Sequence, residues 1–375
     1  MTTRDTNGDP AVELAPEISP IRLGLSDRER ALFAPLAEDG FELGRVMRMD
    51  RGMAFVGIDG AVIRAEPAVH LLKAGSDTDS RIAVGDWVAL ARPEGHELAI
   101  VEVVLPRSSA FIRKDPGEST VGQIVAANVD VILVIQTLGK GGPNLRRLER
   151  ELVIAWDSGA RPVVVLNKAD MCADPGPWRD EVGAVALGVD VHVVSGLTGE
   201  GVDELRAYTE GNRTLAFIGA SGVGKSTLVN RLVGTEVRET GAIREADGKG
   251  RHVTVSREMI LMPGEGILID TPGMRALALW EAEEGMRAAF PDIEELAIGC
   301  RFRDCVHEAE PGCAVQAAVE NDELSIDRLE SYRRLSRELV HLTEKQDVLA
   351  RANRKKGDVQ LSKTIRRFYK GRGHK

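Results

Sequence analysis

The sequence lacks the features that would place the chain in a membrane or outside the cell. Its 375 residues contain no run of 18 or more apolar residues, so no membrane-spanning segment is predicted. Residues 1–20 are rich in Asp, Glu, Thr and Pro, and they lack the basic start and apolar stretch of a secretion signal. These absences predict a cytoplasmic protein without a membrane partner.

Cysteine is also scarce, since the chain has only four. Cys172 stands alone and is interpreted as a packing residue, whereas Cys300, Cys305 and Cys313 lie near His307 in the sequence. Three thiols cannot all pair as disulfides, and in a reducing compartment such a cluster favours a metal ion. Three thiolates and an imidazole predict one closed, structural zinc site, with unmetallated thiols as the alternative.

Aromatic residues make up 4% of the chain, which limits how its N-terminal part could stack on nucleobases. Turn-forming residues separate five short, Val-rich strand candidates in this part: 41–49, 53–58, 62–65, 87–91 and 98–104. They predict a small barrel, either an OB-fold, which often binds RNA, or an SH3-like barrel. Because the aromatics are few, a barrel without RNA contact stays an open alternative.

The middle of the chain alternates strand and helix signals. Continuous apolar runs predict buried parallel strands, and amphipathic segments between them predict helices. The expected strands are 129–137, 163–166, 191–194 and 214–218, and the expected helices are 144–157, 203–208 and 227–233. This alternation predicts an α/β domain whose sites lie at the carboxyl ends of its strands.

A phosphate-binding loop of the form Gly-x4-Gly-Lys-Ser follows the strand 214–218. Backbone N–H groups would hold the phosphates, Lys225 would reach the β and γ phosphates, and Ser226 would ligate Mg²⁺. The residues predicted to bind the nucleotide here are Gly219, Ala220, Ser221, Gly222, Val223, Gly224, Lys225, Ser226 and Thr227.

A guanine-reading motif, Asn-Lys-x-Asp, follows the strand 163–166. The carboxylate of Asp170 would accept two hydrogen bonds from the base, and Lys168 would lie across it. A turn or capping role for the Asn and Asp is the alternative. The residues predicted to bind guanine are Asn167, Lys168 and Asp170, together with Ser195 and Gly196, which follow the next strand.

Asp270-Thr-Pro-Gly273 ends another apolar strand at 266–269. Asp270 would hold Mg²⁺, and the amide of Gly273 would sense the γ-phosphate. The charged, Gly-containing segment 236–257 lies between this motif and the phosphate loop, and it is interpreted as a switch loop.

The motifs stand in an unusual order, because the guanine motif at 167–170 precedes the phosphate loop at 219–226. A chain that is cut and rejoined keeps its fold when its termini lie close together. The order therefore predicts a circularly permuted P-loop GTPase domain.

Together with the Cys-x4-Cys-x-His-x5-Cys cluster and the segments 84–88 and 128–130, this order resembles the ribosome small-subunit-dependent GTPase A family. The resemblance implies an N-terminal OB-fold, a permuted GTPase domain and a C-terminal zinc-binding, helical domain. It also implies GTP hydrolysis in late small-subunit maturation, stimulated by the subunit, with binding to ribosomal RNA. Two alternatives stay open. One is an RNA-binding regulatory switch with incidental hydrolysis. The other is a metal-insertion GTPase, although this sequence lacks the His-rich tract expected of one.

Catalysis would need charge neutralisation by Lys225 and a positioned water. The residue that would match the water-orienting Gln of other GTPases is the apolar Met274. The family resemblance implies a catalytic His at His252, and Thr254 is assigned the Mg²⁺ and γ-phosphate contact. Arg251 and Arg275 are alternative charge stabilisers, and an exposed loop histidine is the alternative for His252.

Charge separates the C-terminal tail from the body of the chain. Residues 351–375 hold ten Lys or Arg and one Asp, a net charge of +9, so the chain's net charge of −9 leaves −18 on residues 1–350. A basic tail favours ribosomal RNA contact, with a solvated, non-specific tail as the alternative. The predicted domains are a flexible extension (1–38), the OB-fold (39–113), the GTPase domain (114–288), the zinc-binding helical domain (289–348) and the basic tail (349–375). A monomer is expected.

Overall fold

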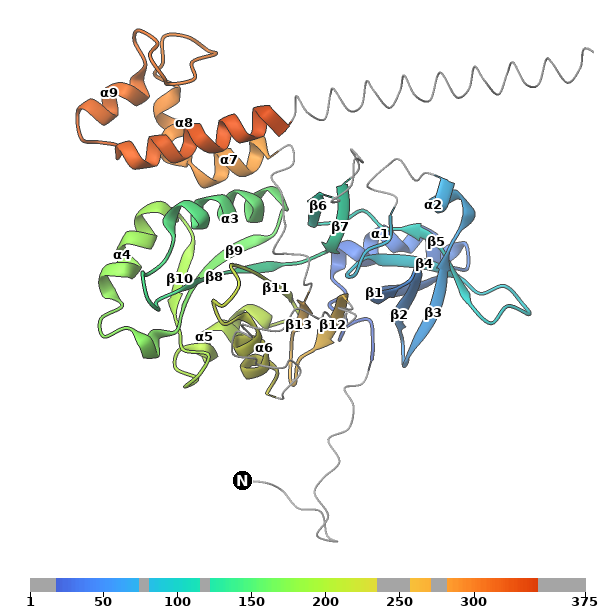
Figure 1. Cartoon of the computed structure of the whole chain (residues 1–375). Helices are drawn as coiled ribbons and strands as arrows, with labels where there is room; N and C mark the ends of the chain where they lie inside the picture. The colour runs from blue at the N-terminus through green and yellow to red at the C-terminus, as the bar shows by residue number, and fades with distance from the viewer. Residues whose placement is uncertain (1–17, 74–80, 115–121, 235–256, 271–281, 343–375) are drawn as a thin grey trace, which may run out of the picture.

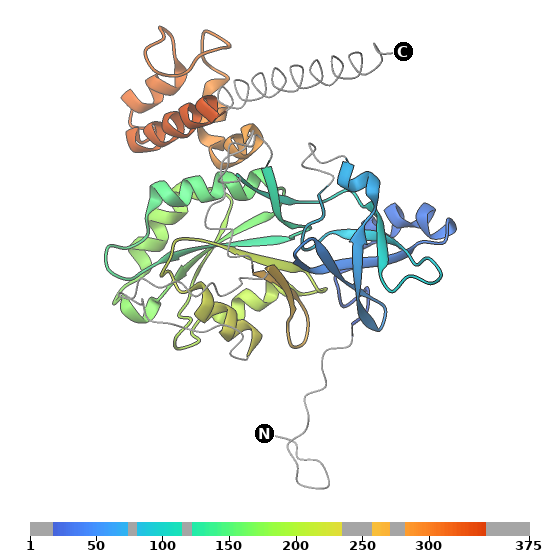
Figure 2. The same ribbon diagram turned by 45° about the vertical axis from the view of Figure 1, so that its right-hand side comes forward.

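A computed structural model describes residues 18–73, 81–114, 122–234, 257–270 and 282–342 (Figure 1). They form a barrel, a central sheet with helices on both faces, and a helical part around the cysteine cluster. The barrel lies at one end of the central sheet, and the cysteine-containing part lies above α3 in both views (Figures 1 and 2). Among the helices in these ranges, none is long and apolar enough to cross a bilayer.

The barrel closes because its first strand pairs with both the second and the fourth. Its strands are β1 (Glu42–Asp50), β2 (Met53–Ile58), β3 (Ala61–Pro67), β4 (Trp87–Ala91) and β5 (Ala99–Val104), with α2 (Val69–Lys73) after β3. The order is β1-β2-β3-β5-β4-β1, in which β3 and β5 are parallel and the other pairs antiparallel. This Greek-key arrangement matches the OB-fold, so that prediction is confirmed over the SH3-like alternative.

The central sheet runs in the order β10-β9-β8-β11-β13-β12. The first five strands are parallel, and β12 is antiparallel to β13. The bounds are β8 (Val131–Thr137), β9 (Arg161–Asn167), β10 (Asp190–Val193), β11 (Thr214–Ile218), β12 (Arg257–Leu261) and β13 (Ile267–Asp270). The apolar runs in the sequence thus correspond to strands covered on both faces.

Helices cover the two faces of this sheet (Figure 1). On one face lie α3 (Leu145–Asp157) and α4 (Gly176–Val185), and on the other lie α5 (Val202–Arg206) and α6 (Lys225–Val233). Asn144 starts α3 because its side chain accepts a hydrogen bond from the Arg147 amide at 3.0 Å. Two 3-10 turns, η2 (Ala169–Met171) and η3 (Ala207–Thr209), complete the domain, and the predicted α/β fold is confirmed.

The barrel and the central sheet are continuous, because β12 pairs with β1 to give one sheet of eleven strands. A separate hairpin of β6 (Ala110–Lys114) and β7 (Gly122–Ala127) leads from the barrel into β8. The predicted domain boundary at residue 113 falls within this hairpin. The strand β12 begins at Arg257, the last residue of the predicted switch segment, and this residue pairs with Met49 of the barrel strand β1.

A buried polar network holds this junction together. Arg45 is 1% exposed and donates hydrogen bonds to the carbonyl oxygens of Leu23 (2.5 Å), Gly85 (3.1 Å) and Asn128 (2.8 Å). Burial lowers the pKa of Arg45 to about 10. At Gly85, where φ is +94°, an added Cβ would lie 2.0 Å from the Ala127 carbonyl oxygen, so only glycine fits. The motifs around residues 85 and 128 therefore join the two domains.

Asp86 and Arg107 form a second buried pair at the junction, with nitrogen to oxygen distances of 2.7 and 2.8 Å. The Asp86 side chain is fully buried, so Arg107→Met removes the direct ion-pair partner of its carboxylate. We expect a loss of about 3–5 kcal/mol in the free energy of unfolding, measured by chemical denaturation. The matched control is Arg92→Met, which breaks an exposed pair with Glu42 and should cost less than about 1 kcal/mol. Equal costs would contradict this account.

The prediction of a flexible extension is wrong for residues 18–38, while residues 1–17 lie outside the described ranges. Residues Asp27–Glu38 form helix α1, which begins with a capping box. The Ser26 side chain accepts a hydrogen bond from the backbone amide of Glu29, and the Glu29 side chain accepts one from the backbone amide of Ser26. Before it, Leu23 is fully buried and its carbonyl accepts from Arg45. The segment is ordered by contacts with the junction, which its local composition does not reveal.

The C-terminal part packs on α3. It contains α7 (Glu283–Ala289), α8 (Pro291–Ala297), α9 (Ala314–Glu320) and a further helix over residues 326–342. Arg328 of that helix is 5% exposed and pairs with Glu149 of α3 and Asp292 of α8, both at 3.0 Å. Its apolar residues belong to the same core cluster as α3 and α4, so this part is anchored to the GTPase domain.

Candidate functional site

Asn167 links three loops at the carboxyl edge of the central sheet. It ends β9 and is 1% exposed. Its Nδ2 donates to the Val223 carbonyl of the phosphate loop at 2.8 Å, and its Oδ1 accepts from the Gly196 amide at 3.0 Å. Because one side chain bonds to both other loops, the guanine motif and the phosphate loop lie side by side.

Asp170 presents an exposed carboxylate in the turn that follows. Its Oδ1 accepts a hydrogen bond from the Ser195 hydroxyl, which in turn accepts from the Thr198 amide at 3.1 Å. Lys168 adopts a left-handed conformation with φ of +67°. Ser195 thus orients the carboxylate that is predicted to recognise the base.

The phosphate loop connects β11 to α6. Lys225 begins α6, and its Nζ donates to the carbonyl oxygens of Gly219 (2.5 Å) and Ala220 (2.7 Å), which holds the ammonium group over the loop. Gly224 has φ of +98°, and an added Cβ would lie 2.3 Å from Asn167 Nδ2. The close approach of this loop to the guanine motif therefore requires glycine. Ser226 and Thr227 lie in the first turn of α6.

Two buried polar residues beside the phosphate loop were not predicted. Gln136 of β8 donates through Nε2 to Glu151 of α3 at 2.8 Å, and both side chains are largely buried. Burial raises the pKa of Glu151 to about 7, although the positive charges of Arg147 and Lys225 oppose the shift. In the sequence Glu151 looks like an ordinary acidic position of an amphipathic helix, so its burial is visible only in the fold.

Several predicted site residues cannot be placed. His252, Thr254 and Gly273 lie outside the described ranges, and so do Arg251, Met274 and Arg275. Asp270 ends β13, opposite Glu258 of β12, and its side chain is also outside the description. The structure brings together the guanine motif, the Ser195 loop and the phosphate loop, and it leaves the switch assignments as predictions.

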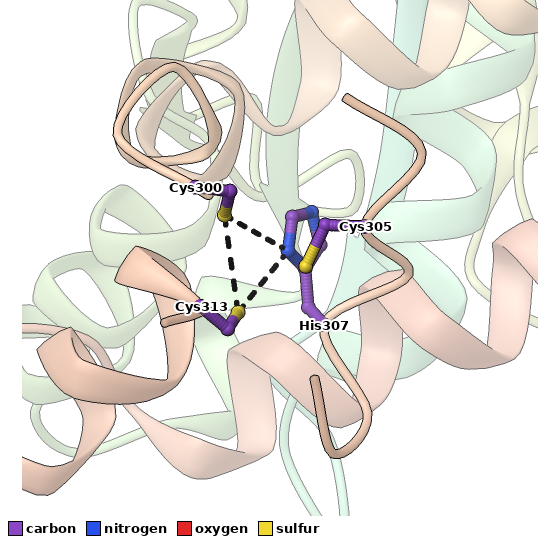
Figure 3. A group of neighbouring side chains, drawn as sticks. All are labelled: Cys300, Cys305, His307 and Cys313. Carbon is purple, nitrogen blue, oxygen red and sulfur yellow. Dashed lines mark hydrogen bonds between the residues drawn. The ribbon is translucent and has the colours of Figure 1, made fainter. Parts of the chain in front are cut away.

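Cys300, Cys305, His307 and Cys313 converge on one point in the C-terminal part (Figure 3). Their ligand atoms all lie within 4.8 Å of one another. The Sγ atoms of Cys300 and Cys313 are 3.9 Å apart, and His307 Nδ1 lies 3.6 and 3.4 Å from them. Tetrahedral Zn²⁺ with Zn–S bonds of about 2.3 Å separates two sulfurs by about 3.8 Å, so the cluster fits such an ion.

The surroundings of the cluster shift the pKa values of its ligands in different directions. Burial raises the pKa of Cys305 to about 12, which opposes ionisation of that thiol without a metal. Burial lowers the pKa of His307, which keeps its imidazole neutral. Burial opposes ionisation of Cys300, but backbone hydrogen bonds from Val315 and Ala314 lower the pKa of its thiol. Gln316 donates to the His307 carbonyl at 3.0 Å and so orients the ligand segment.

Known proteins are similar to this chain over most of its length. The family model described as RsgA GTPase matches residues 104–280. A protein of Streptomyces avermitilis, named small ribosomal subunit biogenesis GTPase RsgA, is 44% identical over 92% of this chain and 89% of its own length. The chain belongs to the RsgA GTPase family. A relative in Lactiplantibacillus plantarum, named small ribosomal subunit biogenesis GTPase RsgA 2, is 40% identical over 88% of this chain and 94% of its own.

Solved structures support the fold of this RsgA family member. YjeQ from Thermotoga maritima is 26% identical, with a TM-score of 0.60 over 80% of this chain and 99% of that one. YloQ, described as a circularly permuted GTPase, superimposes with a TM-score of 0.56 over 82% of this chain and 96% of its own, at 24% identity. A second family model, described as 50S ribosome-binding GTPase, matches residues 214–352, which begin at β11. The predicted family and permutation are confirmed.

Proposed function

We propose that this RsgA family GTPase hydrolyses GTP to GDP and phosphate during late maturation of the small ribosomal subunit, and that the subunit stimulates it. The observation that carries the proposal is the pair of hydrogen bonds in which Asn167 donates to the Val223 carbonyl and accepts from the Gly196 amide, which brings a guanine motif against a phosphate loop. Near full-length relatives named for small-subunit biogenesis supply the biological setting.

Different residues of the chain are proposed to bind the base, the phosphates and Mg²⁺. Asp170 would accept from guanine N1–H and the 2-amino group, and Lys168 would cover the base. The loop amides and Lys225 would bind the phosphates. Ser226 would hold Mg²⁺, with Thr254 and Asp270 as further ligands, and the ion would supply charge neutralisation along the phosphates when bound.

His252 is proposed to orient the attacking water, because the family resemblance implies a catalytic His there and Met274 occupies the position that carries Gln in many GTPases. We expect His252→Ala to lower subunit-stimulated GTP turnover by about 10²-fold while GTP affinity stays the same. The exposed His96, on a barrel loop, provides the matched control His96→Ala. Full stimulated turnover in the His252 variant would refute the assignment.

Zinc is proposed as the ion in the cysteine cluster, since three thiolates and a neutral imidazole fill a tetrahedral shell. Because such a shell leaves no position for a substrate water, its role is structural. The metal-insertion alternative needs an exchangeable metal, and the family relationship does not favour it.

The proposed partner is the small ribosomal subunit with its ribosomal RNA, bound by a monomer in the cytoplasm. The OB barrel and the basic tail, residues 351–375, are the parts of the chain proposed to contact the RNA. The test is co-sedimentation of the full chain with purified small subunits. We expect tighter binding with a non-hydrolysable GTP analogue than with GDP, and equally weak sedimentation in both states would contradict the proposal.

A further inference from the structure

A cavity of about 410 Å³ opens between the helix over residues 326–342, the start of α3 and the loop of the cysteine cluster. Its walls carry the side chains of Arg146, Arg333, Arg334 and Arg337, with Glu308 and Glu330 at its sides. An adjoining cavity of about 400 Å³ shares Arg333, Arg337 and Glu308 with it. We call this feature the arginine groove.

The arginines of the groove differ from their neighbours on the same helices. Arg150 pairs with Glu338, and Arg328 pairs with Glu149 and Asp292. By contrast, no carboxylate of the described residues lies within ion-pair distance of the four groove arginines. The fold therefore gathers four guanidinium groups that its own acids do not neutralise.

Contacts within the fold hold these side chains at the groove. Arg334 Nη2 lies 3.5 Å from the Arg146 carbonyl of α3, and Arg337 Nε donates to the Arg333 carbonyl at 3.2 Å. The Nε atom of Arg333 is buried, and no hydrogen-bond partner for it occurs within the described part. Buried polar groups without partners are uncommon and often mark a site for an ion or ligand.

We propose that the arginine groove binds phosphate groups of the ribosomal RNA backbone, which rests on the proposed function. Guanidinium groups donate two parallel hydrogen bonds to phosphate, and several close together suit a polyanion more than a single small anion. In the sequence, the basic segment 351–375 of net charge +9 follows the helix over residues 326–342, so the chain has further positive charge for a polyanion beyond the groove. Arg328 pairs with Glu149 of α3, so the helix that carries the groove is in direct contact with the GTPase domain.

The test measures binding of the full chain to purified small subunits over a series of salt concentrations. Each lost phosphate contact makes the slope of log affinity against log salt shallower by about 0.7–0.9. We expect this change for Arg334→Gln and for Arg337→Gln, and about twice the change for the double variant.

Arg287→Gln is the matched control, since the Arg287 side chain is exposed on α7, near Glu283 and outside the groove. It should leave the slope unchanged. Equal slopes for the double variant and the wild-type chain would overturn the groove while leaving the proposed function intact. If the wild-type chain does not bind subunits, the proposed function fails, and the series is repeated with a short RNA duplex. Equal slopes for the variants and the wild-type chain on the RNA duplex overturn the inference. It is also overturned if the variants weaken binding to poly-glutamate but leave binding to RNA unchanged.

Discussion

Asp170→Asn is expected to abolish useful GTP binding and to create affinity for xanthosine triphosphate. The carboxylate of Asp170 is proposed to accept two hydrogen bonds from guanine, and bonds to a charged group are each worth about 1.5–3 kcal/mol. Their loss weakens GTP binding by roughly 10²- to 10⁴-fold. Xanthine carries a carbonyl where guanine carries its 2-amino group, so the introduced amide donor suits it.

The measurement is a competition titration of both triphosphates against a fluorescent nucleotide. Asp180→Asn provides a matched control, because Asp180 is an exposed carboxylate on α4, away from the site. Its affinities should equal those of the wild-type chain. If Asp170→Asn kept its preference for GTP over xanthosine triphosphate, Asp170 would not read the base.

Removing the metal is expected to unfold the C-terminal part of the chain. Zinc binding to such ligand sets contributes about 10–16 kcal/mol to small domains at neutral pH, more than the stability of a typical domain. We expect one zinc per chain by elemental analysis, and a loss of helical circular dichroism after chelation. Cys313→Ser should reproduce the loss because Cys313 is both a buried ligand and the N-cap of α9.

Cys172→Ser serves as the control for thiol loss, since Cys172 lies outside the cluster, next to η2. It should keep one zinc and the full helical signal. A chain without bound metal, or one whose helices survive chelation, would contradict the structural role of the cluster.

Local patterns in the sequence were enough to predict most strands and the nucleotide motifs. The strands β2, β4 and β11 occur at the predicted residues because apolar runs bounded by turn residues identify buried strands directly. Asn167 and Gly224 were predicted from short motifs, in which each residue type is required by backbone approach or hydrogen bonding to the nucleotide. The cysteine cluster was equally local, with all four ligands between residues 300 and 313.

Features made by residues far apart in the sequence could not be predicted. Helix α1 begins at a local capping box, Ser26 to Glu29, but the burial of Leu23 against Arg45, 22 residues later, is not visible in residues 1–38 alone. The burial of Glu151 depends on Gln136 of another element. The arginine groove combines Arg146 with Arg334, nearly two hundred residues later, so no sequence window contains it.

This RsgA family GTPase is expected to have the small ribosomal subunit as its partner and to hydrolyse GTP as its function, instead of acting as an RNA-binding switch with incidental hydrolysis. This expectation is tested most directly by measuring steady-state GTP turnover of the full chain alone, with purified small subunits and with purified large subunits. We predict that small subunits raise turnover at least about tenfold, corresponding to about 1.4 kcal/mol of barrier lowering, and that large subunits do not. Turnover that is unchanged by small subunits, or raised equally by large ones, would contradict the claim.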